Sequence, residues 1–329
     1  MIYAGFDPSF IDINIRPLEI ESDNKLLSKL PMFGEHWPNT EITFIPGGNG
    51  FNFCRTLSSL GENITYVGPL DDFFISLVKD QKIDVCLTEI EGAKVNYTAI
   101  LNTHDGEIQF NNIRGELSPS LLNEKILKLF IKSPIKSISN IAFNPKAIEW
   151  ISSLLLGLRE EYDKILFNDN AKLEEKINLL NGISFEGIIF VDPSDISQYS
   201  QIKDFFDILL ALNTMEGDKY LSVNEFEMNK LLSLQGISPL KLSKTLNYPI
   251  IFHTSKVVKF YYNGNELYSL ETQKLSEKKT FVGAGDVFNA SFIFKILKNS
   301  HIEDALKFAI KSASFLIEKG VYPSSENLK

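Results

Sequence analysis

The sequence lacks the residues on which several common protein classes depend. Its 329 residues include two cysteines, Cys54 and Cys86, which are too few for a disulfide framework and form no CxxC pair. The four histidines are scattered, without an HExxH motif or a Cys/His grouping, so no zinc site is expected. No uncharged apolar run approaches the roughly 18 residues that a membrane span requires, and the first residues resemble no signal peptide. We therefore expect a cytoplasmic protein.

The common nucleotide-binding and hydrolase motifs are also absent. There is no GxxxxGK[ST] of a P-loop enzyme, no GxSxG elbow, and no GxGxxG after the first strand. An NAD-dependent dehydrogenase therefore has no support from the sequence. A net charge of −9 argues against a nucleic-acid partner and against a polybasic membrane patch.

Short apolar runs alternate with helical patterns through most of the chain. The expected strands are Ile2–Gly5, Ile64–Gly68, Lys136–Ala142, Lys164–Phe167, Gly187–Asp192, Phe206–Leu212, Pro249–His253, Val257–Tyr262 and Glu266–Leu270. The expected helices are Gly50–Leu60, Ser118–Ile131, Pro145–Leu158, Ala171–Leu180, Asn224–Leu234, Pro239–Leu246, Asp286–Leu297 and Ile302–Lys319. Such alternation predicts a mostly parallel sheet with helices on both faces. Since no linker or internal repeat occurs, we expect one α/β domain over residues 1–329.

Two regions break the alternation, residues 12–46 and about 83–113. Both contain segments with period-2 patterning, such as "DINIRPLEI", "TEITFIP", "KVNYTAIL" and "EIQFNNI". We expect these segments to form a small antiparallel sheet that leaves the main fold and covers a site.

Small residues gather at "VGAGD", residues 282–286, directly before a helical pattern. Glycines let the backbone approach a phosphate closely, and the free N–H groups of Ala284, Gly285 and Asp286 at a helix start could hold negative charge. Asp286 is then either the cap of this helix or a base that accepts a proton from a substrate hydroxyl.

A second small-residue run, "PGGNGFNFCRTLSSLG", spans residues 46–61 and places Asn52 in the first turn of a helix. The Asn52 amide can both donate and accept hydrogen bonds, which suits a polyol. A capping or turn role for Asn52 is the alternative.

Together these two runs resemble the signatures of the ribokinase-like (PfkB) carbohydrate kinase family. The spacing from Asn52 to Leu60–Gly61 matches the first signature, and "GAGDVFNASF" is similar to the second. Further family-like segments lie between them in the expected order, namely "GPLDDFF", "IIFVDPSD" and "LSVNEFEMNKLL". The resemblance therefore covers nearly the whole chain.

The resemblance implies an ATP- and Mg²⁺-dependent kinase, with ADP as donor still open. Its acceptor would be a hydroxyl, with a primary one favoured, of a sugar, sugar phosphate or nucleoside. The antiparallel sheet would be a lid that sometimes pairs two subunits into a homodimer.

The resemblance also gives roles to individual residues. Asp286 falls on the catalytic base, and Gly283, Ala284 and Gly285 on the anion hole and nucleotide contacts. Asn224 and Glu227 fall on positions that organise Mg²⁺ through water. Gly48, Asn52 and Asp12 fall on substrate-binding positions, although Asp7 rivals Asp12 because the spacing from Gly5 is two residues longer than usual.

Two segments depart from the family pattern. Thr280-Phe281-Val282 replaces the usual Asp-Thr-x before GAGD, and Thr254-Ser255-Lys256 replaces Thr-x-Gly beside the nucleotide. Thr254 and Lys256 are then nucleotide contacts, or Lys256 is a solvated side chain at a strand turn. "HT" at 253–254 resembles the ADP-dependent branch. These departures keep open a catalytically inactive protein with a regulatory or binding role.

Overall fold

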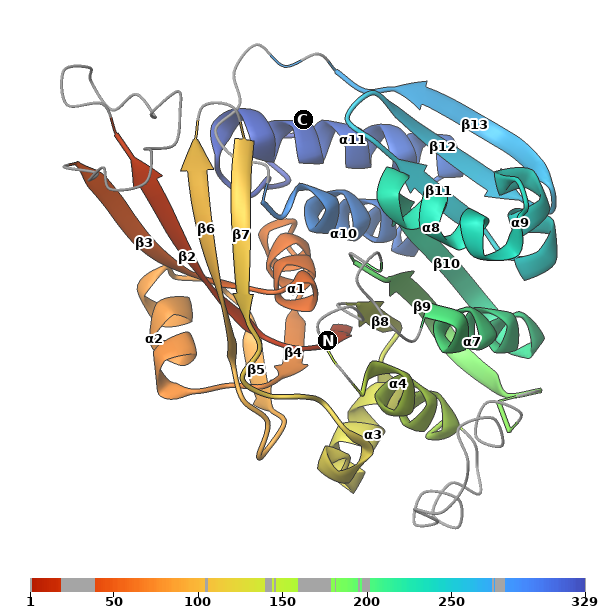
Figure 1. Cartoon of the computed structure of the whole chain (residues 1–329), viewed down its shortest axis with the longest axis horizontal. Coiled ribbons are helices and arrows are strands. Elements are labelled where there is room, and N and C mark those ends of the chain that lie inside the picture. The colour runs from red at the N-terminus through yellow and green to blue at the C-terminus, as the bar shows by residue number, and fades with distance from the viewer. Residues whose placement is uncertain are drawn as a thin grey trace.

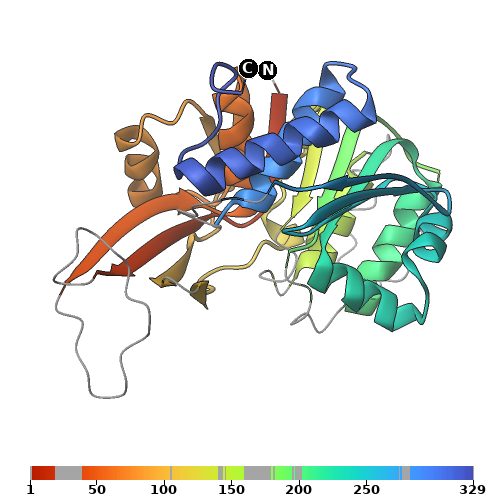
Figure 2. The same ribbon diagram turned by 90° about the horizontal axis from the view of Figure 1, so that it is seen from above.

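A largely parallel sheet between two layers of helices forms the body of the molecule (Figures 1 and 2). The computed structural model describes residues 2–18, 39–103, 106–139, 144, 146–158, 179–180, 182–194, 196, 202–273, 275 and 282–328. Six strands follow one another in the order β13-β12-β11-β10-β9-β8, and three more in the order β1-β4-β5. Because β1 lies beside β8, the two sheets continue one another. Their bounds are β1 Ile2–Phe6, β4 Ile64–Gly68, β5 Cys86–Glu89, β8 Ile135–Ser139, β9 Ser184–Asp192, β10 Glu216–Asn224, β11 Ile250–His253, β12 Val257–Tyr262 and β13 Asn265–Glu271.

The strands of the body supply two separate cores, because side chains alternate across a sheet. In β9, Ile188 and Phe190 belong to one core, and Ile189 and Val191 to the other. The first core is covered by α1 (Asn49–Ser59), α2 (Asp72–Asp80), α10 (Ala284–Leu297) and α11 (Ile302–Lys319). The second is covered by α3 (Glu124–Lys132), α4 (Ala147–Leu156), α7 (Ile202–Thr214), α8 (Glu225–Gln235) and α9 (Pro239–Leu246). The predicted α/β class, with helices on both faces of a mostly parallel sheet, is confirmed. Among the described helices, none combines the length and apolar character needed to cross a bilayer.

A second sheet extends out from the body (Figures 1 and 2). Its strand order is β3-β2-β6-β7, with bounds β2 Phe10–Pro17, β3 Thr40–Gly47, β6 Asn96–Thr103 and β7 Gly106–Asn112. The pairs β2–β3 and β6–β7 are antiparallel, but β2–β6 is parallel. The sheet is thus mixed rather than antiparallel, because β2 and β6 are joined by a long connection through β3, α1, β4, α2 and β5. That connection also corrects the expected bounds, since β5, within residues 83–113, pairs with β4 of the body.

The projecting sheet has two chemically different faces, because residues that pair across strands share a face. We call one the apolar face; it carries Ile13, Ile15, Ile42, Phe44, Ala99, Leu101, Ile108 and Phe110. We call the other the polar face; it carries Asp12, Asn14, Thr43, Thr98 and Asn111, together with Ile45 opposite Asp12 and Ile100 opposite Asn14. Strands with this alternation are typical of a sheet that buries one side against another surface.

The sequence mistook one element and missed two others. Phe206–Leu212 was expected as a strand but lies within α7, and neither the helix α2 nor the strand β10 was expected. A short continuous apolar run does not distinguish a buried strand from a buried helix, and this one is buried along α7. The expected strand Lys164–Phe167, and all but the last two residues of the expected helix Ala171–Leu180, lie outside the described residues.

Candidate active site

Asp286 lies in the first turn of α10, at the end of the glycine-rich segment. Gly283 is the N-cap of that helix with φ 77°, a left-handed conformation that glycine adopts without strain. No side chain caps the helix, so the interpretation of Asp286 as a helix cap is wrong. The Asp286 carboxylate is 7% exposed and accepts a hydrogen bond instead from the Asn52 side chain, 2.9 Å away.

Asn52 joins the starts of two helices. It lies in the first turn of α1, where Gly48 is the N-cap with φ 98°, and its side chain is almost fully buried. Its Nδ2 donates to Oδ2 of Asp286, and its Oδ1 accepts from the hydroxyl of Tyr322 at 2.9 Å. The two glycine-rich segments of the sequence therefore meet, although 234 residues separate Asn52 from Asp286.

Asp7 and Asp12 both border the loop that precedes α1. Oδ2 of Asp7 accepts from the Gly50 N–H at 2.7 Å and from the Ser139 hydroxyl at 3.0 Å. A Cβ added to Gly50 would lie 1.9 Å from Oδ1 of Asp7, and one added to Gly47 would lie 2.2 Å from Oδ2 of Asp12. Asp7 thus binds the first turn of α1 at Gly50, whereas Asp12, on the polar face of the projecting sheet, lies against Gly47 at the end of β3.

The carboxylates near Asp286 repel one another. Burial raises the pKa of Asp286 well above its usual range, and the charges of Asp192, Asp7 and Asp12 raise it further, while the hydrogen bond from Asn52 lowers it. Burial also raises the pKa of Asp192 to about 6, against hydrogen bonds from its neighbours. A carboxyl group with a raised pKa takes up a proton more readily than an exposed one, as a general base must.

Asp192 also fixes α10 to the sheet. Asn289, one turn after Asp286, donates to Oδ2 of Asp192 at 2.7 Å, and the Ser222 hydroxyl donates to Oδ1 of Asn289 at 2.7 Å. No role was predicted for Asp192, yet it ends an expected strand, where parallel sheets place their binding residues. No sequence signal pointed to Ser222 or Tyr322.

Asn224 and Glu227 form a capping box at the start of α8. Oε2 of Glu227 accepts from the Asn224 backbone N–H, and Oε1 accepts from the Asn224 side chain, both at 2.8 Å. The Asn224 Oδ1 accepts in turn from the backbone N–H groups of Phe226 and Glu227. The two residues are thus adjacent and linked, as the metal prediction requires, but they also have a structural role.

Thr254 and Lys256 lie in the turn between β11 and β12. The Thr254 hydroxyl oxygen accepts from the backbone N–H groups of Lys256 and Val257, and Lys256 is exposed. His253 comes nearer to α10, since a Cβ on Gly285 would lie 3.9 Å from its Cε1, and burial lowers its pKa to about 4. The nucleotide role of Thr254 and Lys256 stays a prediction, and Thr280 lies outside the described residues.

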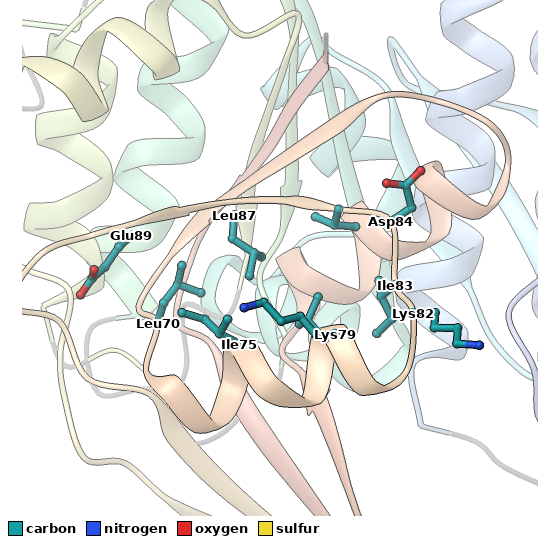
Figure 3. Close-up of a pocket in the computed structure, with 10 residues that line it drawn as sticks. Leu70, Ile75, Lys79, Lys82, Ile83, Asp84, Leu87 and Glu89 are labelled. Carbon is teal, nitrogen blue, oxygen red and sulfur yellow. The ribbon is translucent and has the colours of Figure 1, made fainter.

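A groove of about 700 Å³ lies away from these residues, between α2 and β5 (Figure 3). Its lining is aliphatic, with two lysines and two acids, and is formed by Leu70, Ile75, Val78, Lys79, Lys82, Ile83, Asp84, Val85, Leu87 and Glu89. None of these is a predicted site residue. The candidate active site predicted from the sequence lies instead where the carboxylates meet the starts of α1 and α10.

Comparison with solved structures shows that the fold is that of the ribokinases. Ribokinase from Thermotoga maritima superimposes with a TM-score of 0.69 at 19% identity, covering 100% of this chain and 98% of that one. Ribokinase from Cryptococcus neoformans var. grubii in complex with ADP gives 0.68 at 17% identity, covering 99% and 97%.

Sequence comparison defines the family. A ribokinase from Lactococcus lactis is 23% identical over 306 residues, which cover 89% of this chain and 86% of that protein. The family pattern described as "pfkB family carbohydrate kinase" matches residues 19–168 and 216–325. The chain belongs to this family and is a kinase of the sugar and nucleoside kinase class, so the resemblance noted in the sequence is confirmed.

Proposed function

We propose that this protein transfers the γ-phosphoryl group of ATP, with Mg²⁺, to a hydroxyl, preferably a primary one, of a sugar or nucleoside. The observation that carries the proposal is the buried Asp286 carboxylate at the uncapped start of α10, hydrogen-bonded to Asn52. The ADP in the Cryptococcus ribokinase structure supports a nucleotide as donor. The cytoplasmic location stays a prediction from the sequence.

In this proposal Asp286 takes the proton of the acceptor hydroxyl. The first hydrogen bond within α10 runs from the Val287 N–H to the Gly283 carbonyl, so the N–H groups of Ala284, Gly285 and Asp286 precede the intrahelical ladder. These N–H groups and the helix dipole are suited to hold the negative charge of a phosphoryl group. Positioning and charge stabilisation account for most of the catalysis of phosphoryl transfer.

The arginines of the projecting sheet favour an acceptor without a phosphate group. Arg114 lies over the ring of Tyr97, 5.1 Å from its centre, and Tyr97 is on the side of β6 opposite Asp12. Arg16 shares the side of Asp12 but forms an ion pair with Glu41 at 3.2 Å. It is four residues from Asp12, which is about 13 Å along a strand. These positions support an acceptor that lacks a phosphate group for either arginine to bind.

A coupled assay of ADP release over sugars, sugar phosphates and nucleosides tests the proposal. We expect turnover with an unphosphorylated sugar or nucleoside and ATP. Turnover only with a sugar phosphate would overturn the acceptor class. A parallel assay of AMP release tests ADP as donor. No turnover with any acceptor and either donor would favour the inactive, regulatory alternative.

Asn224 and Glu227 fit a hydrated Mg²⁺. Glu227 supplies a carboxylate and Asn224 an amide oxygen, the kinds of group to which the water molecules around a metal ion donate, and the two side chains are hydrogen-bonded to each other. Mg²⁺ prefers oxygen ligands and usually keeps several waters, with phosphates completing its shell. When bound, the ion would neutralise charge on the nucleotide phosphates. The water-mediated contact is the one that the family resemblance implies for these two positions.

Glu227→Gln should raise the Mg²⁺ concentration needed for half-maximal rate, by roughly tenfold for a lost charge–water contact. Glutamine also serves at this position of a capping box, but its NH₂ group cannot accept as the second carboxylate oxygen does, so the melting temperature should also fall and the metal dependence is the readout that counts. Glu225→Gln is the matched control, because it removes an exposed carboxylate from the same first turn. Full activity with unchanged metal dependence in Glu227→Gln would remove the assignment.

We also propose a homodimer through the apolar face of the projecting sheet. On that face Phe110 is 61% exposed and Ile42 is 56% exposed. An exposed contiguous apolar patch on a soluble protein marks an interaction surface. A second copy of this sheet is the partner of matching chemistry, because its apolar face offers the same side chains.

Phe110→Glu should convert the dimer to a monomer in size-exclusion chromatography with light scattering, because it buries a charge in the interface. Thr43→Glu, which adds the same charge to the polar face, should leave the dimer intact. A monomeric parent protein at micromolar concentration would contradict the proposal.

A further inference from the structure

The segment after α11, near the C-terminal end of the sequence, contacts the candidate active site. Gly320 ends α11 in a left-handed conformation, φ 71°, and the chain then runs back beside α1. The Ser59 hydroxyl donates to the Pro323 carbonyl at 2.6 Å, and the Ser325 hydroxyl donates to the Leu60 carbonyl at 2.6 Å. These two bonds attach the segment that carries Tyr322 to the end of α1, in addition to the contacts of Tyr322 itself.

Tyr322 itself is fixed on three sides. Its hydroxyl donates to Oδ1 of Asn52 at 2.9 Å, and the Arg55 guanidinium lies over its ring, 4.1 Å from the centre. A Cβ on Gly283 would lie 3.3 Å from the same hydroxyl. Arg55 and Asn52 are one turn apart on α1, so both face Tyr322.

We propose that Tyr322 is a positioning residue that orients the Asn52 amide so that its NH₂ group donates to Asp286. A primary amide has one acceptor end and one donor end. Because the Tyr322 hydroxyl donates to the oxygen, the nitrogen is left facing the Asp286 carboxylate. The opposite orientation would set an amide oxygen against that carboxylate. The catalytic meaning of this arrangement rests on the proposed function, but the hydrogen-bond chain does not.

The charges around Asp286 determine whether loss of the Tyr322 hydroxyl raises or lowers the pKa of Asp286. Asp192 on β9, Asp7 after β1 and Asp12 on β2 all disfavour its ionised form, whereas the Asn52 donor favours it. Burial raises the pKa of Tyr322 far above neutrality, so it stays a hydroxyl donor, with Arg55 beyond its ring. His253 on β11, near Gly285, is neutral at pH 7. Loss of the Tyr322 hydroxyl should therefore raise the pKa of Asp286.

Tyr322→Phe tests this with the ring and its contact to Arg55 retained. Without the Tyr322 hydroxyl, the Asn52 amide is no longer held with its NH₂ group toward Asp286, so the hydrogen bond to that charged carboxylate weakens. Since hydrogen bonds to charged groups are among the stronger ones, kcat/KM at pH 7 should fall about tenfold. The acidic limb of the pH profile should move to higher pH, because the base is active only when deprotonated. Tyr248→Phe is the matched control: its buried hydroxyl donates to the Leu209 carbonyl in the other core, so it should cost stability without moving the profile.

A second measurement keeps the inference separate from the proposed function. The titration of Asp286, followed by carboxyl-carbon NMR in selectively labelled protein, should shift to higher pH in Tyr322→Phe. The same substitution in an Asn52→Ala background should add no further shift. An unchanged titration, or an equal shift in both backgrounds, would overturn the role of Tyr322. A shifted titration in a protein without kinase activity would uphold that role and reject the proposed function instead.

Discussion

Asp286→Asn should lower the turnover rate roughly 10²- to 10⁴-fold, the range attributed to general-base catalysis. The substituted side chain keeps the size of the carboxylate, and its amide oxygen can still accept from Asn52. It cannot take the proton of an acceptor hydroxyl. Nucleotide binding should survive, because the N–H groups at the start of α10 are unaffected.

The same substitution should not lower the melting temperature at pH 7. A carboxyl group whose pKa is raised on folding contributes stability below its unfolded pKa and loses that contribution as the pH rises through its folded pKa. At pH 7 the ionised Asp286 is therefore unfavourable beside Asp192, Asp7 and Asp12. A neutral amide removes that repulsion. The pattern of lost rate with retained or increased stability is typical of a functional residue.

Asp304→Asn is the matched control, because Asp304 lies in the first turn of the neighbouring helix α11 and is exposed. Its turnover should equal that of the parent. Asp286→Asn with more than about a tenth of the parental turnover would contradict a general-base contribution of that size. A marked drop in melting temperature would show that Asp286 has a structural role.

Local physics made part of this site predictable. The glycine-rich segments before α1 and α10 stand out in the sequence because each precedes a helical pattern, and the second brings the unpaired backbone N–H groups of a helix start next to the carboxylate of Asp286. The fold class followed from the alternation of strands and helices. The segments of the projecting sheet were also recognisable, because apolar and polar residues alternate along its strands.

The other contacts of the site join residues that are far apart in the chain, so they could not be predicted from the sequence. Tyr322 is 270 residues from Asn52, and Ser222 is 67 residues from Asn289, so no local pattern connects them. The mistaken strand at Phe206–Leu212 has a different cause, since this short run is apolar apart from Asp207, and a run of that length does not distinguish a strand from the buried side of a helix. Spacing along the sequence could not show which of Asp7 and Asp12 binds the acceptor, because both lie next to the start of α1.

The two acids lie in different surroundings in the structure. Asp7 is 1% exposed, and its Oδ2 already accepts from Gly50 and Ser139. Asp12 lies on the polar face of the projecting sheet, beside Gly47. We therefore predict that Asp12, not Asp7, binds the hydroxyls of the acceptor.

Asp12→Asn should raise the KM for the acceptor about 10- to 100-fold, because a hydrogen bond to a charged group contributes about 1.5–3 kcal/mol. The KM for the nucleotide and the melting temperature should change little. Asp7→Asn should do the reverse: a buried carboxylate with two donors is lost, so the free energy of unfolding should fall by about 1–3 kcal/mol while the acceptor KM stays near that of the parent. The neighbouring glycines supply an independent check, since Gly47→Ala would displace Asp12 and Gly50→Ala would displace Asp7. If Asp7→Asn raised the acceptor KM and Asp12→Asn did not, the assignment would be reversed.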